Sequence, residues 1–353
     1  MPAPPTPITS GARWLSRAVV VNHDTGSETE VGVVSATVTV DRGSNARRTV
    51  SAELTPDVDP ALLVPPHRLK LFAGYRIGSV DHWASLAHVR FGDRSNGPMS
   101  SWKVAGASFE TLVAAARFRE PRWVPGESSL KSVAWRFIQE AVPWAEIRDH
   151  TPVDALTPVG GVIYERDRLE AIVGRENSIV TALGLDFGCD ADGTFTFRDL
   201  PGNTMPTWEA HEGGLLVDYS EKLSVAQVRN SWVVVSDHPD TNPVRGYAMD
   251  TDPTSPTRVS RWGEATDFLT SPILTDLDQA NHVAAAQLAK TRGLVATLDM
   301  TTVPNPWADI TEVVASRHGG QVHYYQLDRI THSLKAEALT ASTSAREVSV
   351  LDV

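Results

Sequence analysis

The sequence contains a single cysteine, which excludes two common ways of stabilising a fold. Among 353 residues, Cys189 is the only thiol, so an internal disulfide is impossible and a zinc site built on thiolates lacks its ligands. We expect Cys189 to be a small, buried, hydrophobic side chain. The fold is therefore predicted to hold together without disulfides or thiolate-bound metal.

Long apolar runs and an excess of positive charge are also missing. No stretch approaches the ~18 consecutive apolar residues of a membrane span, and the apolar run near the start is too short for a secretory signal. We expect neither membrane insertion nor export. The 32 Lys and Arg residues stand against 43 Asp and Glu, a net charge of −11. Such a chain does not strongly attract nucleic acid phosphates, so we expect no stable nucleic-acid binding.

The common catalytic signatures are absent as well. The sequence has no G-x-S-x-G elbow, no H-E-x-x-H pair, no phosphate-binding G-x-x-x-x-G-K-[ST] loop and no G-x-G-x-x-G after a strand. A triad or carboxylate pair assembled by the fold from distant residues stays possible. We predict that the protein is not an enzyme and assign no catalytic, cofactor-binding or metal-binding residue.

The composition is that of a folded globular protein. Hydrophobic residues make up 41% of the chain and charged residues 21%, close to the globular average. The length exceeds what one hydrophobic core usually organises, which favours two or three packed units.

The first part of the chain is predicted to be a β-barrel domain over residues 1–104. In residues 29–41, Val34, Ala36, Val38 and Val40 alternate with polar residues, as on one face of a half-buried strand. A turn rich in Gly, Asp and Asn then leads to a second strand over residues 48–54, which predicts a hairpin. Further short strands are expected over residues 68–75, 82–91 and 101–106, with the spacing of a sandwich or barrel.

The next segment, residues 105–205, is predicted to be a small α/β domain. Apolar residues recur at helical spacing over residues 128–142, after serines that could cap the helix. A second helical stretch over residues 177–184 leads into a hairpin in which Leu185 and Phe187 face Phe195 and Phe197 across a turn.

The remainder is predicted to be a second β-barrel domain over residues 206–345, followed by a tail over residues 346–353. Its short segments are rich in β-branched and aromatic residues. One helix is expected near residues 276–292, where an acidic start, an Ala-rich middle and a basic last turn precede a Gly. The predicted fold class is thus mainly β, with two β-barrel or sandwich domains separated by a small α/β domain.

Two clusters have residue types that bind metals. Asp190, Asp192 and Gly193 resemble the start of a calcium loop, but its third ligand and closing Glu are missing, so we predict a hairpin turn with Gly193 at positive φ. His318, His323 and His332 could bind a metal if their strands pair. Without acidic or Cys companions, these histidines are better interpreted as polar strand positions that face solvent or a neighbouring subunit.

Two other features admit a structural explanation. Carboxylates in the run Thr275, Asp276, Leu277 and Asp278 would cap the start of the predicted helix and offset its dipole. The ten Trp residues are dispersed over all three units, as is typical of core or interface anchors. They include Trp83, Trp102, Trp123, Trp135, Trp144 and Trp232.

Several segments, in order, resemble the opening barrel of phage tail hub proteins: VSATVTVD, RRTVSAELTP, RLKLFAGY, HWASLAHVRF and SWKVAGASFETLVAAARF. Later segments resemble the second barrel of the same proteins: RNSWVVVSD, HVAAAQLAK, TTVPNPWADI and VHYYQLDRITHSL. The chain departs from the family pattern at Ala87 and Ser108, which replace a Gly and an Asp, and near Ile310 and Thr311, where a Gly-Asp pair usually follows. These departures concern the exit of the first barrel and one local turn.

The resemblance implies a structural protein of the virion tail tip, made in the host cytoplasm. It implies a homotrimeric hub ring that joins the sixfold tail tube, or a distal tail protein, to threefold tip or fibre proteins. Two similar barrels per chain give six barrels when three copies close a ring. Members of the family surround a channel for tape-measure protein and DNA, and an acidic lining would let DNA pass because it repels phosphates.

Two other functions stay open at this point. A peptidoglycan-degrading enzyme of the tail tip would need a carboxylate pair or a metal in a cleft. A carbohydrate-binding module that recognises the host surface would need clustered, exposed Trp or Tyr side chains.

Overall fold

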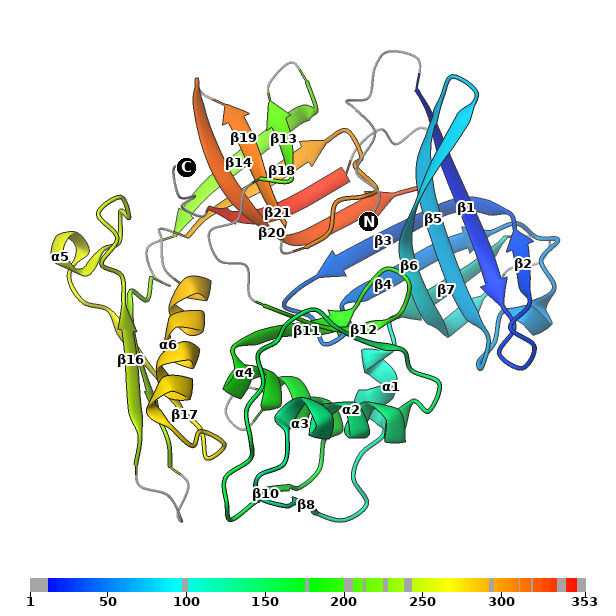
Figure 1. Cartoon of the computed structure of the whole chain (residues 1–353). Coiled ribbons are helices and arrows are strands. Elements are labelled where there is room, and N and C mark those ends of the chain that lie inside the picture. The colour runs from blue at the N-terminus through cyan, green and yellow to red at the C-terminus, as the bar shows by residue number, and fades with distance from the viewer. Residues whose placement is uncertain are drawn as a thin grey trace.

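The computed structural model describes residues 12–96, 101–174, 178–199, 206–211, 214–224, 228–237, 243–291, 295–310, 312–318, 320–334 and 341–347. Within these residues the strands form one 13-stranded sheet and three small sheets of two or three strands (Figure 1). No helix in this part of the chain is long and apolar enough to cross a bilayer. The protein is mainly β, as the sequence predicted.

The N-terminal lobe is one half of the large sheet, in the order β3-β4-β7-β6-β5-β1-β2. A short 3₁₀ helix, η1 (Pro60–Leu62), lies between β4 and β5. The predicted hairpin is confirmed, with Val38 opposite Val50. Val34 was expected to be buried but is 52% exposed, because a register shift between Val33 and Ser35 interrupts the alternation. The strands of this lobe are β1 (Arg13–Val21), β2 (Glu28–Val31), β3 (Val33–Asp41), β4 (Arg48–Leu54), β5 (Arg68–Ile77), β6 (Val80–Ser95) and β7 (Trp102–Ala107).

The C-terminal lobe is the other half of the same sheet. Strands β14, β18, β21 and β20 follow one another in the sheet, and β19 pairs with both β20 and β13. The long strand β20 joins the two lobes, because its residues Arg329–Ser333 pair antiparallel with Thr37–Asp41 of β3. The strands are β13 (Trp208–His211), β14 (Leu216–Ser224), β18 (Val295–Thr302), β19 (Val313–His318), β20 (Gln321–Ser333) and β21 (Ala341–Glu347).

In its described residues, the middle unit carries four helices and five short strands. Ser129 caps the predicted amphipathic helix, since its side chain accepts a hydrogen bond from Ser132 N. The predicted hairpin of β11 and β12 places Phe187 opposite Phe197. The elements are α1 (Glu110–Ala115), α2 (Leu130–Ala141), α3 (Arg168–Val173), α4 (Ile179–Leu183), β8 (Arg122–Val124), β9 (Ile147–Asp149), β10 (Val162–Tyr164), β11 (Leu185–Cys189) and β12 (Phe195–Asp199).

A fourth part, the side unit, interrupts the C-terminal lobe between β14 and β18. Its strands were expected within the second barrel, but β15 (Ser231–Val235) pairs with β16 (Arg245–Met249) and β17 (Thr266–Thr270) in a separate sheet. The expected helix is α6 (Leu277–Thr291), and it covers this sheet (Figure 1). Close packing demands a glycine, since a Cβ on Gly246 would lie 2.4 Å from the Ala280 carbonyl carbon. A short helix, α5 (Val259–Trp262), precedes β17.

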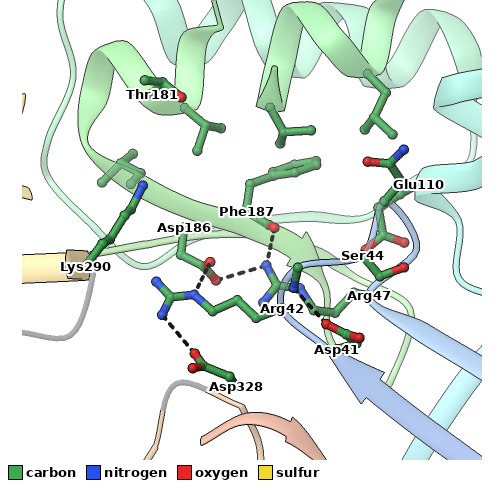
Figure 2. A pocket seen from close by; sticks show the side chains of 16 residues that line it. Asp41, Arg42, Ser44, Arg47, Glu110, Thr181, Asp186, Phe187, Lys290 and Asp328 are labelled. Atoms are coloured by element: carbon green, nitrogen blue, oxygen red, sulfur yellow. Dashed lines mark hydrogen bonds and ion pairs between the residues drawn. The ribbon is translucent and has the colours of Figure 1, made fainter. Parts of the chain in front are cut away.

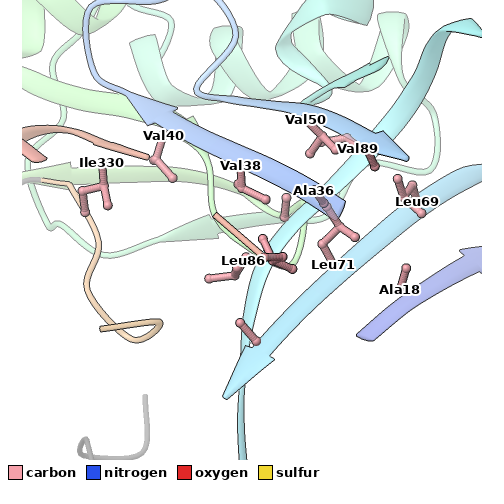
Figure 3. Packing of buried hydrophobic residues seen from close by; sticks show 14 of the residues in the cluster. Ala18, Ala36, Val38, Val40, Val50, Leu69, Leu71, Leu86, Val89 and Ile330 are labelled. Atoms are coloured by element: carbon pink, nitrogen blue, oxygen red, sulfur yellow. The ribbon is translucent and has the colours of Figure 1, made fainter. Parts of the chain in front are cut away.

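Two hydrophobic cores organise these four parts. The first is continuous between the two lobes and joins Val38, Val40 and Leu86 to Ile330 of β20 (Figure 3). The second is shared by the middle unit and the side unit, where Phe137 and Phe195 belong to the same cluster as α6. The cores therefore do not follow the order of segments along the chain.

Candidate functional site

Two consecutive arginines lie where the lobes and the middle unit meet. Because successive residues of an extended chain point to opposite sides, Arg47, just before β4, and Arg48, its first residue, reach different neighbours. Arg47 donates from Nη2 to Asp186 Oδ2 at 3.1 Å and to the carbonyl oxygen of Phe187, both on β11 (Figure 2). Arg48 donates from Nη2 to Asp309 Oδ1 at 2.8 Å, in the loop between β18 and β19. The chain at β4 is thus fixed to the middle unit and to the C-terminal lobe.

A third arginine extends this junction. The Arg42 guanidinium lies 3.5 Å from Asp186 and 3.6 Å from Asp328, so one carboxylate of β11 is shared by two arginines (Figure 2). Its Nη1 also donates to Gln326 Oε1 at 3.2 Å. The connection between β3 and β4 therefore contacts β11 and β20 at once.

The charges of the junction are buried and mutually dependent. Arg47, Arg48 and Asp309 are 7%, 2% and 5% exposed. Burial opposes the charge of Arg47, but the carboxylates of Asp186 and Glu110 outweigh it and raise the arginine pKa. Burial likewise opposes ionisation of Asp186, and Arg47 and Arg42 overcome this, so the Asp186 pKa is lowered. Removing one partner of such a pair leaves an uncompensated buried charge, which costs about 3–5 kcal/mol.

Aromatic contacts hold the loop between β18 and β19 against the N-terminal lobe. Tyr75 of β5 donates its hydroxyl to the carbonyl oxygen of Pro304 at 2.6 Å. Trp307 stacks on the Tyr75 ring with centroids 6.3 Å apart, and Trp14 meets the same ring edge-on at 5.0 Å. These contacts place Asp309 beside Arg48.

Two cavities lie on opposite faces of β4. The first, about 570 Å³, is lined by charged residues of both signs from the N-terminal lobe, middle unit and α6, with ion pairs of Arg42 and Arg47 across its wall (Figure 2). The second, about 230 Å³, is lined by Arg48, Asp309 and His332 together with Trp83 and Trp307. Both belong to the junction between units, the position where ligand sites most often form.

The predicted hairpin turn at Asp190 is confirmed. Gly193 has a φ of 84°, and Asp190 Oδ1 accepts hydrogen bonds from the backbone N–H groups of Asp192 at 3.0 Å and Thr194 at 2.9 Å. The carboxylate that resembled a calcium ligand thus holds the turn.

The three histidines do not come together as a metal site. The described residues contain no group of three His, Cys, Asp or Glu side chains that could hold a metal ion. His318 ends β19 and His323 lies on β20 beside it, opposite Ser316. His332, at the other end of β20, was expected to face solvent or a subunit neighbour, but it is 1% exposed. The reason is that it pairs with Val38 of β3, so it lies inside the joint between the lobes.

The capping and cysteine predictions are also confirmed. Asp276 Oδ1 accepts a hydrogen bond from Gln279 N at 2.8 Å at the start of α6. Cys189 is 2% exposed, and burial, reinforced by Glu110, raises its thiol pKa.

Departures from the family pattern have local explanations. Ser108 is fully buried, and its Oγ accepts a hydrogen bond from Arg48 N at 3.0 Å, so it fixes the chain where it leaves β7. Ala87 is a fully buried strand residue opposite Leu71. Ile310 is 2% exposed, whereas Thr311 lies outside the described residues.

The tryptophans divide into anchors and surface residues. Trp102 packs against the first core, and Trp135 and Trp232 pack against the second, as predicted for anchors. Trp144 meets Phe109 edge-on and lies under the guanidinium of Arg68, and Trp123 is 57% exposed. Trp83 and Trp307 line the same cavity, which the sequence does not predict, because 224 positions separate two residues that carry no local signal.

Three solved structures show which known fold this is. The tail protein from Neisseria meningitidis MC58 has a TM-score of 0.65 at 13% identity, over 94% of this chain and 96% of that chain. Prophage tail protein gp18 from Listeria monocytogenes EGD-e has a TM-score of 0.60 at 8% identity, over 94% of each chain. The E. coli c3393 protein, a component of the type VI secretion system with structural similarity to T4 bacteriophage tail proteins gp27 and gp5, has a TM-score of 0.53 at 9% identity, over 90% of this chain and 74% of that chain.

At these identities the likeness concerns the fold. The chain has the fold of phage tail and hub-like proteins, which confirms the predicted fold class. No protein-family model matches the sequence, and no curated protein matches it significantly.

Proposed function

Because the fold is that of phage tail proteins, we propose that this chain is a non-enzymatic, structural hub protein of a tail tip. In this proposal three copies close a ring that joins the sixfold tail tube, or a distal tail protein, to threefold tip or fibre proteins. The ring surrounds the channel for tape-measure protein and DNA in the virion. The proposal includes the division of the chain near residues 104 and 205, with the side unit as an insertion in the C-terminal lobe.

The observation that carries this proposal is the way the two lobes join. Within the chain, β3 of one lobe pairs with β20 of the other, so the lobes stand side by side in one sheet. Among the described residues, β14 pairs only with β18 and β2 only with β1. Each end of the sheet thus keeps one strand edge that a neighbouring copy can pair with.

The large sheet ends in β14 on one side and in β2 on the other, and two different ends favour a head-to-tail ring. A contact between the β14 end of one copy and the β2 end of the next is heterologous, and such contacts close a ring when the rotation per copy fits. Three copies then present six lobes toward a sixfold tube. The same ring carries three side units, one from each copy. The buried ion pairs at β4 support the same role, because an adapter must hold its lobes at a fixed angle.

The charge of the chain suits a channel protein. With a net charge of −11, a ring of three copies repels DNA phosphates, so DNA passes without sticking. At the junction, Arg42 and Arg47 pair with Asp186, and Arg48 pairs with Asp309.

A pair of valine substitutions tests the ring. Val217 on β14 is 58% exposed and Val80 at the β5–β6 hairpin is 54% exposed. Val217→Lys should reduce the trimer fraction on tail tubes roughly tenfold, because a charge placed in an interface core is costly. Val80→Lys should leave it unchanged. Native mass spectrometry and electron microscopy of reconstituted tail tips measure both. A stoichiometry other than three at the tip, or equal assembly of the two variants, would contradict the proposal.

A further inference from the structure

The smaller cavity is lined by two buried side chains, Arg48 and His332, that keep polar atoms without a hydrogen-bond partner among the described residues. Arg48 is 2% exposed and His332 is 1% exposed. Nη2 of Arg48 is occupied by Asp309, but Nε and Nη1 of Arg48 and Nδ1 of His332 have no hydrogen-bond partner among the described residues. An unsatisfied buried polar group costs about 1–3 kcal/mol. Because both side chains line the cavity, a molecule that enters it can supply hydrogen-bond partners to Arg48 and His332.

The charges around the cavity favour a neutral guest. Asp309 accepts from Arg48 and lies 3.7 Å from Arg198 Nη1. Asp192 and Asp309 line the cavity together with Arg48, so an anion would meet carboxylates and a cation would meet the guanidinium. Burial, together with the charge of Arg48, lowers the His332 pKa to about 4, and the imidazole is neutral near pH 7. A neutral imidazole offers one donor and one acceptor. Hydroxyl groups both donate and accept, and they add no charge to a buried site.

The walls of the cavity are apolar and aromatic. Trp83 of β6, 37% exposed, and Trp307 of the β18–β19 loop line it together with Val40, Leu86 and Ala308. An indole face is electron-rich and packs well against the polarised C–H groups of a sugar ring. The volume of about 230 Å³ lies below the ~300–1,000 Å³ of sites for drug-sized ligands, so it suits one ring.

We propose that this cavity binds a single saccharide residue, with its ring against Trp83 and Trp307 and its hydroxyl groups on Arg48 and His332. The exposed side of Trp83 leaves room for the rest of a glycan to continue into solvent. The site is formed by the N-terminal lobe, the turn of β11–β12 and the β18–β19 loop. It requires the folded junction and is independent of the proposed ring.

Titration of the full chain with glucose, galactose, N-acetylglucosamine and rhamnose tests the site. At least one sugar should give a saturable change in tryptophan fluorescence and a saturable heat in calorimetry. Trp83→Ala should weaken this binding roughly tenfold, because it removes one stacking face. His332→Phe should abolish sugar binding, because it removes the imidazole nitrogens while it keeps an aromatic ring at that position.

Trp123→Ala is the matched control, since it removes one exposed indole from β8 and not from the cavity. It should leave the affinity unchanged. Thermal unfolding confirms that each variant is folded.

Three outcomes would overturn the saccharide site: no saturable signal with any of the four sugars, equal losses in Trp83→Ala and Trp123→Ala, or crystals grown with sugar that show water only at Arg48 Nη1 and His332 Nδ1. None of these bears on the ring, because the binding measurement does not depend on the oligomeric state. Conversely, a protein that binds sugar but assembles with a stoichiometry other than three at the tip would contradict only the hub.

Discussion

The two β lobes are built from the chain in different ways. The N-terminal lobe uses one continuous stretch, from β1 to β7, whereas the C-terminal lobe is divided by the side unit between β14 and β18. In the first lobe most strand pairs join neighbours in sequence, and β4 with β7 and β1 with β5 complete the order. The second is held from outside as well, by β3 along β20 and by the aromatic and ionic contacts of the β18–β19 loop. A lobe interrupted in sequence thus depends on its partner for its position.

Loss of Arg48, which joins β4 to the C-terminal lobe, is expected to cause the largest loss of stability. Arg48→Met removes the nearer cation from the buried Asp309 carboxylate and leaves Arg198 at 3.7 Å, so it should lower the free energy of unfolding by about 3 kcal/mol. Arg76→Met, which breaks the exposed pair with Asp81 within the N-terminal lobe, should change it far less because water screens that pair. Urea denaturation measures both variants.

The double variant Arg48→Met/Asp309→Leu sharpens the result. Replacing both partners of a buried ion pair by apolar side chains is often neutral, so most of the lost stability should return. A double variant as unstable as Arg48→Met would show that the charges themselves are not the cause.

Acid should affect both lobes through their buried histidines. Burial lowers the pKa of His88 on β6 and of His332 on β20 to about 4, while the unfolded chain takes up these protons near pH 6.5. The unfolded state binds more protons between those values, so stability should fall as the pH drops from 6.5 to 4, by on the order of 3 kcal/mol for each histidine. His88→Gln and His332→Gln should each remove part of this slope in urea titrations across that range. A full slope in both variants would assign the acid response to other groups.

Base should act on the C-terminal lobe in the opposite direction. Burial, with the Asp309 carboxylate nearby, raises the pKa of Glu312 to about 7. The folded state then holds a proton that the unfolded state has released, so stability is lost as the pH rises from about 4.5 through 7. Glu312→Gln should be more stable than the parent by about 2 kcal/mol at pH 8, with a smaller gain at pH 5. Calorimetry at the two pH values measures the difference, and Glu30→Gln at the surface is the control.

The smallest effect on stability is expected at the free edge of the C-terminal lobe. Val217→Lys and Val80→Lys alter exposed side chains and should each change the free energy of unfolding by less than about 0.5 kcal/mol. Thermal unfolding of the isolated chain checks this. A large loss for Val217→Lys alone would mean that β14 packs within its own lobe, and its effect on assembly would then be indirect.

The sequence predicted the parts of the fold that local patterns encode. The β3–β4 hairpin, the α2 helix, the β11–β12 hairpin with its Gly193 turn and the capped α6 helix all follow from periodicity and turn residues within a short window. The separate sheet of the side unit was missed, because its strands have the same composition as those of the lobes. Nothing in composition tells a strand which sheet it joins.

The junction was missed for a related reason. Arg47, Arg48, Asp186 and Asp309 are ordinary charged residues with no local signal, and their partners lie 139 and 261 positions away. The one sequence clue was two adjacent arginines where a strand begins, because alternation sends their side chains to opposite faces. Trp307 and Asp309 belong to the segment that resembles hub proteins, but the resemblance does not reveal what they touch.

Strand β20 has a mechanical consequence. One half of it pairs with β19 and the other half with β3, and β21 runs along it. A twist applied to one lobe is therefore passed to the other lobe, unless β20 bends or the hydrogen bonds between β20 and its neighbours break. A torque applied at one end of the molecule would be transmitted through the backbone of β20, and the two lobes would rotate together as one rigid body.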